Sequence, residues 1–225
     1  MPPSASTTPL PAPLLVIDGS GPACFAGVLD ADQKWIGRTE IDGAPLESLF
    51  PAVKAVLDGA GLELEALRGY IYCQGPGSVL GLRLCAMALE TWSRLQPTPP
   101  PCFAYNSLQL VAACILADHP ELENALLVSD WKKGAWNAVL IEAGRPRTPH
   151  VADDSEIQEW TAPLFHLPQR KGWQTPPAHA TTVANTPARL PELLAQSDLL
   201  TPTPGIQLHT SGVNTFQKWI PTRHR

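Results

Sequence analysis

The first half of the chain alternates short apolar runs with stretches of helical periodicity. Residues Leu14–Asp18 form an apolar run that ends in an acidic residue, which is typical of a buried strand. Apolar runs over 24–29 and 35–41 follow, and Asp30-Ala31-Asp32 between them is typical of a hairpin turn. The chain is therefore expected to begin with three neighbouring strands.

Helices and strands alternate after this hairpin. Apolar residues at helical spacing predict a first helix over 46–57, and Gly59 and Gly61 are expected to end it. The apolar residues of this helix are Leu46, Leu49, Phe50, Val53, Val56 and Leu57. The later expected elements are a strand over 69–73, a helix over 81–95, a strand over 102–104 and a helix over 107–117. The order β-β-β-α-β-α-β-α places the chain in the α/β class.

A second copy of the opening segment occurs further along the chain. Shifting residues 14–30 forward by 112 positions places them on 126–142 without a gap. The identical pairs are Leu14, Leu15, Val16, Asp18, Ala23 and Ala26 with Leu126, Leu127, Val128, Asp130, Ala135 and Ala138. This similarity indicates an internal duplication, and chance likeness between two hairpins is the alternative. A duplication would give two facing α/β lobes, an arrangement that commonly binds nucleotide between the lobes.

A glycine-rich turn lies between the strand over 69–73 and the next helix. It reads Gly-Pro-Gly-Ser-Val-Leu-Gly-Leu-Arg, with Gly75, Pro76, Gly77, Ser78, Gly81 and Arg83 as its distinctive positions. Such turns often bind phosphate at the helix N-terminus. However, the Gly-Lys-Ser/Thr ending of a Walker loop is absent. The other interpretation is a tight turn that starts a packed helix, with Ser78 as its N-cap.

The helix after this turn is apolar around most of its circumference. Its charged residues Arg83, Glu90 and Arg94 share one stripe, and Glu90 and Arg94 are spaced to form an ion pair. The apolar positions include Leu82, Cys85, Ala86, Leu89 and Trp92. A helix of this kind is expected to be buried on more than one side. It is either an ordinary internal helix or one that pairs with residues 46–57 and with another subunit.

Composition narrows the classes of function. The chain has 225 residues, 44% of them hydrophobic, with a net charge of −5 and a pI near 5.6, so an extended nucleic-acid surface is not expected. Five cysteines without a Cys-x-x-Cys spacing suggest reduced core residues of a cytoplasmic protein. No apolar run is long enough to span a membrane. Basic residues cluster at Lys132 and Lys133 and at the end of the chain (Lys218, Arg223, His224 and Arg225), either as local contacts to nucleic-acid phosphates or as solvated side chains.

The sequence gives little support for catalysis. No two of the six histidines are four residues apart, so we expect no metal site of the helical His-x-x-x-His kind. Asp18 is a candidate for a residual nucleotide or Mg²⁺ contact, although an aspartate at a strand end commonly caps a turn. Trp131 follows Asp130 where a phosphate clamp would need a close backbone approach. We therefore expect no catalytic residues and no cofactor.

Several segments together resemble the TsaB (YeaZ) family, a Gcp-like group of bacterial tRNA-modification subunits. They are Leu14–Asp18, Leu-Phe-Pro-Ala-Val at 49–53, the glycine-rich turn at 75–83 and Asn-Ser-Leu at 106–108. Residues 216–220 are also similar. The turn matches the family's Gly-Pro-Gly-Ser-Phe-Thr-Gly-Leu-Arg at seven of nine positions. The chain departs from the family at Asp18-Gly19-Ser20, Pro45-Leu46-Glu47 and Asp130-Trp131-Lys132.

The resemblance implies a fold, a role and partners. The fold would be the actin-like ATPase (ribonuclease H-like) architecture, with a Pro-rich disordered lead-in over 1–13, an N-terminal lobe over 14–118 and a smaller, irregular C-terminal lobe over 119–225. The role would be that of a non-catalytic scaffold in tRNA N6-threonylcarbamoyladenosine modification. The partners would be a TsaD-type catalytic subunit and a TsaE-type ATPase, with tRNA contacted only through the complex and a homodimer formed alone. The alternatives are an ATP-dependent phosphotransferase or ATPase of the same superfamily and a stand-alone regulatory homodimer.

The resemblance implies that the partner interface is the helix pair over 46–57 and 81–94. Its residues are expected to be Leu46, Leu49, Phe50, Val53, Leu82, Cys85, Ala86, Leu89 and Trp92.

Overall fold

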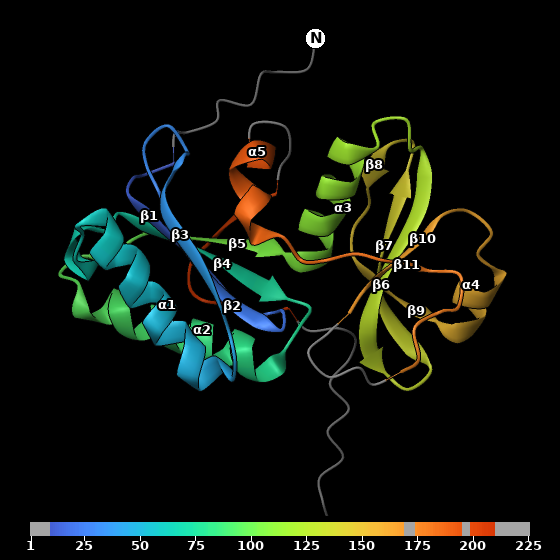
Figure 1. Ribbon diagram of the computed structural model, residues 1–225, viewed down its shortest axis with the longest axis horizontal. Coiled ribbons are helices and arrows are strands. Elements are labelled where there is room, and N and C mark those ends of the chain that lie inside the picture. Colours follow the sequence, from blue (N-terminus) through green and yellow to red (C-terminus); the bar gives the residue numbers. More distant parts are fainter. Residues whose placement is uncertain (1–9, 169–173, 195–198, 210–225) are drawn as a thin grey trace, which may run out of the picture.

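Two β-sheets lie side by side in the computed structural model, which describes residues 10–168, 174–194 and 199–209 (Figure 1). The first sheet has the order β12-β5-β4-β1-β2-β3 and the second the order β11-β10-β6-β7-β8, with β9 also paired to β7. The strands of the first sheet are β1 (Leu14–Asp18), β2 (Ala23–Leu29), β3 (Trp35–Asp42), β4 (Gly69–Gly75), β5 (Cys102–Asn106) and β12 (Thr201–Thr203). Those of the second are β6 (Asn124–Lys132), β7 (Ala135–Glu142), β8 (Arg145–Pro146), β9 (His150–Asp153), β10 (Leu164–Leu167) and β11 (Thr181–Thr182).

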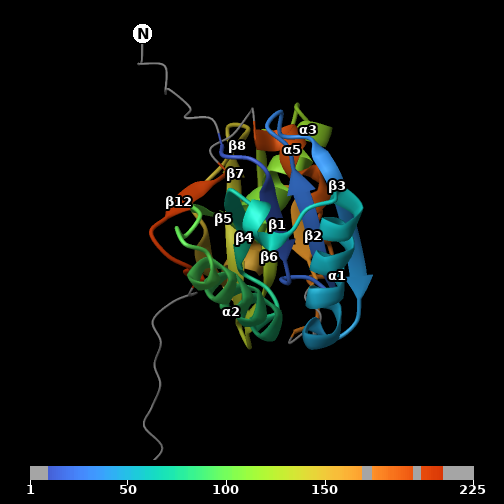
Figure 2. The ribbon, with the colours of Figure 1, turned by 90° about the vertical axis from the view of Figure 1, so that its left-hand side faces the viewer.

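The helices form layers around the two sheets. They are α1 (Pro45–Ala60), α2 (Val79–Leu95), α3 (Ser107–Asp118), α4 (Asp154–Glu159) and α5 (Leu190–Leu194), with short 3-10 turns at Leu64–Ala66 and Pro187–Arg189. Helices α1 and α2 cover one face of the first sheet (Figure 2). Helix α3 lies between the two sheets, and α4 packs on the far face of the second sheet (Figure 1).

The alternation of strand side chains explains these layers. In β1, Leu15 and Ile17 face α1 and α2, whereas Leu14 and Val16 face α3 and α5. Both faces of β1 are therefore buried, which explains why it is a continuous apolar run. Helix α3 is apolar on all sides because its residues contact both sheets.

The internal duplication is confirmed by the topology. Strand β1 pairs antiparallel with β2 and parallel with β4, and β6 pairs antiparallel with β7 and parallel with β10. The parallel pair of β4 and β5 has its counterpart in β10 and β11. The predicted α/β class with two duplicated lobes is therefore confirmed, and the strands β8 and β11 of the second lobe are only two residues long.

The gapless alignment of the two copies is wrong beyond the first strand. Asp18 lies opposite Phe25, whereas Asp130 lies opposite Trp136, so the second turn is one residue shorter. The counterpart of Ala26, which lies opposite Ile17, is Asn137, opposite Ser129. The matches of Ala23 and Ala26 with Ala135 and Ala138 are thus out of register by one position, and Asp18 and Asp130 remain true counterparts.

Every element predicted up to residue 118 is present, with small differences at the ends. Helix α1 ends at Gly61, which has a left-handed φ of 64°, and Gly59 lies inside the helix rather than ending it. Helix α2 begins two residues earlier than predicted, directly after Ser78. Strand β5 continues to Asn106, whose side chain caps α3 by accepting hydrogen bonds from the backbone N–H groups of Leu108 and Gln109.

The described end of the chain returns to the first lobe. Strand β12 pairs with the edge strand β5, and α5 packs against the core beneath β1 and β4. The Trp35 indole N–H donates a hydrogen bond to the carbonyl oxygen of Ala188 at 2.8 Å. The lobe boundary at residues 118/119 falls between α3 and β6 and stays a prediction. The predicted lead-in up to residue 9, the segment 216–220 and the basic residues beyond 209 lie outside the described residues.

Candidate functional site

Asp18 lies at the end of β1, at the point where the two lobes meet. Its carboxylate accepts three hydrogen bonds, from the backbone N–H of Ser20 at 2.6 Å, the Tyr105 hydroxyl at 2.6 Å and the Asn185 amide at 2.8 Å. Its residue is only 2% exposed. These donors stabilise a buried charge, and the Ser20 bond makes Asp18 the cap of its own turn. A role for Asp18 in Mg²⁺ or nucleotide contact stays a prediction.

Tyr105 remains a hydrogen-bond donor to Asp18 over the whole working pH range. Burial raises the pKa of its hydroxyl well above the ordinary value, and the neighbouring Asp18 charge raises it further.

The glycine-rich turn packs directly on the turn that follows Asp18. The Ser78 backbone N–H donates to the carbonyl oxygen of Ser20 at 2.8 Å. A Cβ atom at Gly81 would lie 2.0 Å from the Gly19 carbonyl oxygen, and one at Gly77 would lie 2.5 Å from the Ser20 Cβ. The glycines thus allow two backbone segments to touch.

The conformations of Ser78 and Gly75 fit a tight turn that leads into a helix. The Ser78 side chain accepts a hydrogen bond from the Gly81 backbone N–H at 3.3 Å, as predicted for an N-cap. Gly75 has a φ of 106°, a backbone conformation that favours glycine, and precedes Pro76. Arg83 is exposed on α2. Of the two interpretations, the structure supports a tight turn that starts a packed helix.

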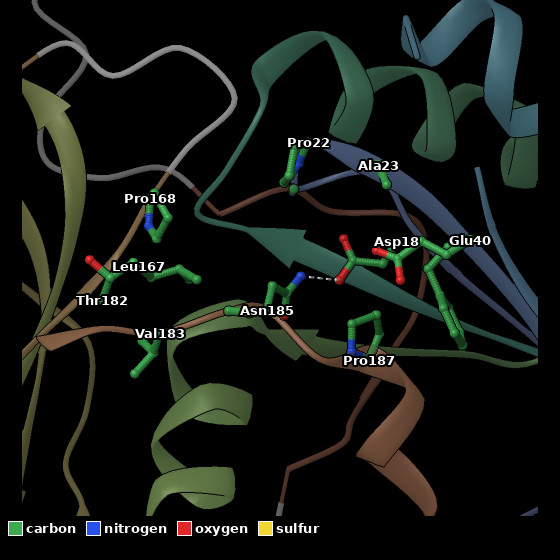
Figure 3. A pocket seen from close by; sticks show the side chains of 13 residues that line it. Asp18, Pro22, Ala23, Glu40, Leu167, Pro168, Thr182, Val183, Asn185 and Pro187 are labelled. Carbon is green, nitrogen blue, oxygen red and sulfur yellow. Dashed lines mark hydrogen bonds between the residues drawn. The ribbon is translucent and has the colours of Figure 1, made fainter. Parts of the chain in front are cut away.

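A cleft of about 360 Å³ opens beside Asp18, between the two lobes (Figure 3). Its lining residues are Asp18, Gly21, Pro22, Ala23, Phe25, Glu40, Leu167, Pro168, Thr182, Val183, Ala184, Asn185 and Pro187. None of these is Lys, Arg or His, and two are carboxylates. Burial raises the pKa of Glu40, and the nearby charges of Asp42 and Asp18 raise it further. Such a lining disfavours the phosphates of a nucleotide.

The second lobe has a buried histidine–aspartate contact where the first has the Asp18 network. His166 Nε2 lies 3.2 Å from Asp130 Oδ1, and both side chains are almost fully buried. The Trp136 ring packs edge-on against the His166 ring, with centroids 5.9 Å apart. Lys132 lies over the Trp131 ring, 4.2 Å from its centroid. Within residues 10–168, 174–194 and 199–209, no group of three or more His, Cys, Asp or Glu residues is placed to hold a metal ion.

The sequence analysis did not identify Asn185 or His166. Asn185 comes from the proline-rich second half, where no periodicity indicates an element. His166 lies in a four-residue strand between two leucines. Their roles come from contacts with residues that are distant in the sequence, Asp18 for Asn185 and Asp130 for His166.

The predicted partner interface needs correction. The side chains of Leu49, Val53, Leu82, Cys85, Leu89 and Trp92 are buried in the chain's own core, because α1 and α2 direct them at the first sheet. Ala86 is half-buried. Of the nine predicted residues, only Leu46 and Phe50 are exposed, at 63% and 47%.

Leu46, Phe50 and four further apolar side chains are exposed on the outer surface of these helices. We call this set the α1–α2 face, and its residues are Leu46, Phe50, Val79, Leu80, Met87 and Leu95. Phe50 joins the two helices through an edge-to-face contact with Trp92, with centroids 6.2 Å apart. The predicted ion pair of Glu90 and Arg94 is confirmed, at 2.6 Å. Both helices lie on the outside of the molecule, away from the second lobe (Figure 2).

Two solved structures resemble this chain over most of their length. YeaZ from Pseudomonas aeruginosa aligns with a TM-score of 0.56 and 21% identity over 76% of this chain and 83% of that chain. An uncharacterized protein with similarity to peptidase YEAZ from Pseudomonas aeruginosa aligns with a TM-score of 0.60 and 18% identity, over 87% and 98%. No protein-family profile and no curated protein matches the sequence. None of the helices in the described ranges is long and apolar enough to cross a lipid bilayer.

These alignments bear on the fold. Identities of about one in five establish common architecture, and the coverage includes both lobes. The predicted resemblance to YeaZ is therefore confirmed, and the chain has the two-lobed fold of the YeaZ structures.

Proposed function

We propose that this chain is a non-catalytic scaffold subunit of the tRNA threonylcarbamoyladenosine modification machinery, which binds a TsaD-type catalytic subunit. The observation that carries the proposal is the α1–α2 face, an exposed set of large apolar side chains on two adjacent helices of a YeaZ-like fold. Large exposed apolar patches on globular proteins commonly mark protein–protein contacts.

The chemistry of this face suits a protein partner. Phe50 and Met87 are of the residue types enriched at the centre of interfaces. The ion pairs of Lys54 with Asp58 and of Arg94 with Glu90 lie on the same helices and would form a polar rim. A TsaE-type ATPase would then join the assembled pair, and tRNA would be contacted through the complex.

The lack of a catalytic role is supported by the state of the inter-lobe cleft. The Asp18 carboxylate is already held by three donors from the chain itself, and the lining offers no cation for a triphosphate. The glycine-rich turn packs directly on the backbone of the turn after Asp18. These features count against the alternative of an ATP-dependent phosphotransferase.

The test is co-purification of the tagged chain with the TsaD-type subunit of the same organism. Phe50→Glu and Met87→Glu put charges on the α1–α2 face without entering the core, and each should abolish co-purification. Val151→Glu is the matched control, because Val151 is 39% exposed on β9 of the other lobe. It should leave the complex intact.

Two outcomes would contradict the proposal. If the Phe50 and Met87 variants capture the partner as well as the control does, the interface lies elsewhere. If no TsaD-type subunit binds and the chain only dimerises, the stand-alone homodimer is the better account. Calorimetric titration with Mg-ATP tests the phosphotransferase alternative, which predicts micromolar binding of Mg-ATP by the isolated chain.

A further inference from the structure

We infer that the cleft between the lobes binds a small organic cation that carries a protonated amine. The inference rests on the row of Asp18, Phe25 and Glu40 in the lining of the cleft and on buried oxygen atoms at an adjoining recess. It concerns a different surface from the α1–α2 face and does not depend on the proposed partner.

In the register of three neighbouring strands, Phe25 lies between the two carboxylate residues of the cleft lining. Asp18 lies directly opposite Phe25 on β2, and Phe25 lies directly opposite Glu40 on β3. Residues opposite one another on neighbouring strands project from the same face of the sheet, so all three line the cleft. Figure 3 shows the Asp18 and Glu40 carboxylates on the same side of the cleft. Carboxylates and an aromatic face are the groups that attract an ammonium.

A recess that adjoins the cleft adds buried oxygen atoms without hydrogen-bond partners in the described structure. This narrow recess of about 10 Å³ shares Gly21, Leu167, Pro168 and Asn185 with the cleft and is also lined by Ser129. Ser129 is only 1% exposed, and within the described part of the chain its Oγ has no hydrogen-bond partner. The same holds for Asn185 Oδ1, because the amide nitrogen of Asn185 donates to Asp18 and Ser20. Buried polar atoms without partners are rare, and these two can accept N–H donors.

The charge of the lining residues favours a protonated amine over neutral or anionic ligands of similar size. Neither the cleft nor the recess has a Lys, Arg or His among its lining residues. The pKa of Glu40 is raised by burial and by the Asp42 and Asp18 charges, and a bound cation would relieve this repulsion. A volume of about 360 Å³ suits a small molecule. The apolar walls, which include Pro22, Leu167 and Val183, would contact its carbon chain.

The experiment is calorimetric titration of the full chain at low salt with three ligands. The probe is 1,4-diaminobutane, with 1,4-butanediol as its uncharged match and Mg-ATP as the anionic ligand. We expect the diamine to bind and the other two to give no binding heat. Glu40→Gln should weaken diamine binding at least about tenfold, because it removes a charged acceptor. Glu47→Gln, which changes an exposed carboxylate of α1 outside the cleft, should have no effect.

A second variant tests the recess that adjoins the cleft. Ser129→Ala removes a buried hydroxyl with no partner in the described structure, so it should keep the fold and weaken diamine binding. The inference is overturned if the diol binds as well as the diamine, if Glu40→Gln binds the diamine like the unchanged chain, or if the diamine gives no binding heat. Each of these results leaves the partner test at the α1–α2 face unaffected, so the two proposals can fail separately.

Discussion

At the scale of single residues, the glycine-rich turn and the turn after β1 approach so closely that two glycines leave no room for a side chain. Gly81 on α2 touches Gly19 in the turn after β1, and Gly77 touches Ser20. Both segments are backbone, so neither can move aside as a flexible side chain could. The turn that resembles a phosphate loop in sequence is therefore a joint that holds α2 against β1.

This joint makes the effect of alanine depend on position. Gly81→Ala would place a methyl group 2.0 Å from the Gly19 carbonyl oxygen, and we expect it to lower the free energy of unfolding by about 3 kcal/mol or more. Gly59→Ala in α1 meets nothing within 4 Å and should raise it by about 0.5–1 kcal/mol, since alanine favours helix. Urea unfolding measures both. Similar gains in the two variants would mean that helix propensity, and not this contact, decides the outcome.

The candidate site was partly predictable at this scale. Asp18 and the glycine-rich turn stand out in the sequence, because an acidic strand end and a Gly-Pro-Gly-Ser run have local meanings. Glu40 and Asn185 have no such local signal, because their roles depend on residues of other elements, Phe25 for Glu40 and Asp18 for Asn185. Asn185 reaches Asp18 across 167 positions of sequence, and no local pattern encodes such a contact.

At the scale of elements, the sequence predicted where helices lie better than which side of them is buried. Periodicity identified α1 and α2, but α2 has apolar residues on both sides. Leu82 and Leu89 face the core, whereas Leu80 and Met87 face outward. Only the position of the sheet separates the two sets. The strands β8, β11 and β12 are too short for any period, and tertiary pairing alone defines them.

The attachment of the 3-10 turn Pro187–Arg189 to α3 predicts a dependence of stability on pH. Arg189 donates two hydrogen bonds to Asp118, and these lower the pKa of Asp118 below its ordinary 3.8. Because the folded-state pKa is depressed, the stabilisation is present above the unfolded value and is lost as the pH falls through the lowered folded pKa. Arg189→Met should therefore lower the thermal midpoint at neutral pH and by progressively less below pH 3.8.

The control for this prediction is Asp118→Asn, which removes the titrating group itself. Its thermal midpoint and that of the unchanged chain should converge as acid protonates Asp118. The difference in thermal midpoint between the unchanged chain and either variant could instead stay constant from pH 7 down to the acid limit of folding. Protonation of Asp118 would then have no effect on stability, which contradicts the prediction.

At the scale of the whole molecule, the two lobes share core residues as well as a topology. Leu110 and Cys114 of α3 pack against the first sheet, whereas Val111 and Ile115 pack against the second. The described end of the chain also crosses back, from β11 in the second sheet to β12 in the first. The duplication visible in the sequence predicted two similar units, but it could not predict that one helix would serve as the core of both.

This shared helix predicts that the lobes unfold together. Leu49→Ala empties a fully buried position on α1 in the first lobe and should cost about 2–5 kcal/mol. If α3 couples the lobes, amides of β6 in the second lobe should lose as much protection from hydrogen exchange as those of β1. Ile157→Ala on α4 is the reciprocal test, in which the protection of the β1 amides from hydrogen exchange is measured. Val151→Ala, at an exposed position, is the control. Calorimetry should give one transition with equal calorimetric and van't Hoff enthalpies. If β6 keeps its protection in the Leu49 variant, each lobe is an independent unit, and the packing of α3 against the second sheet contributes little to stability.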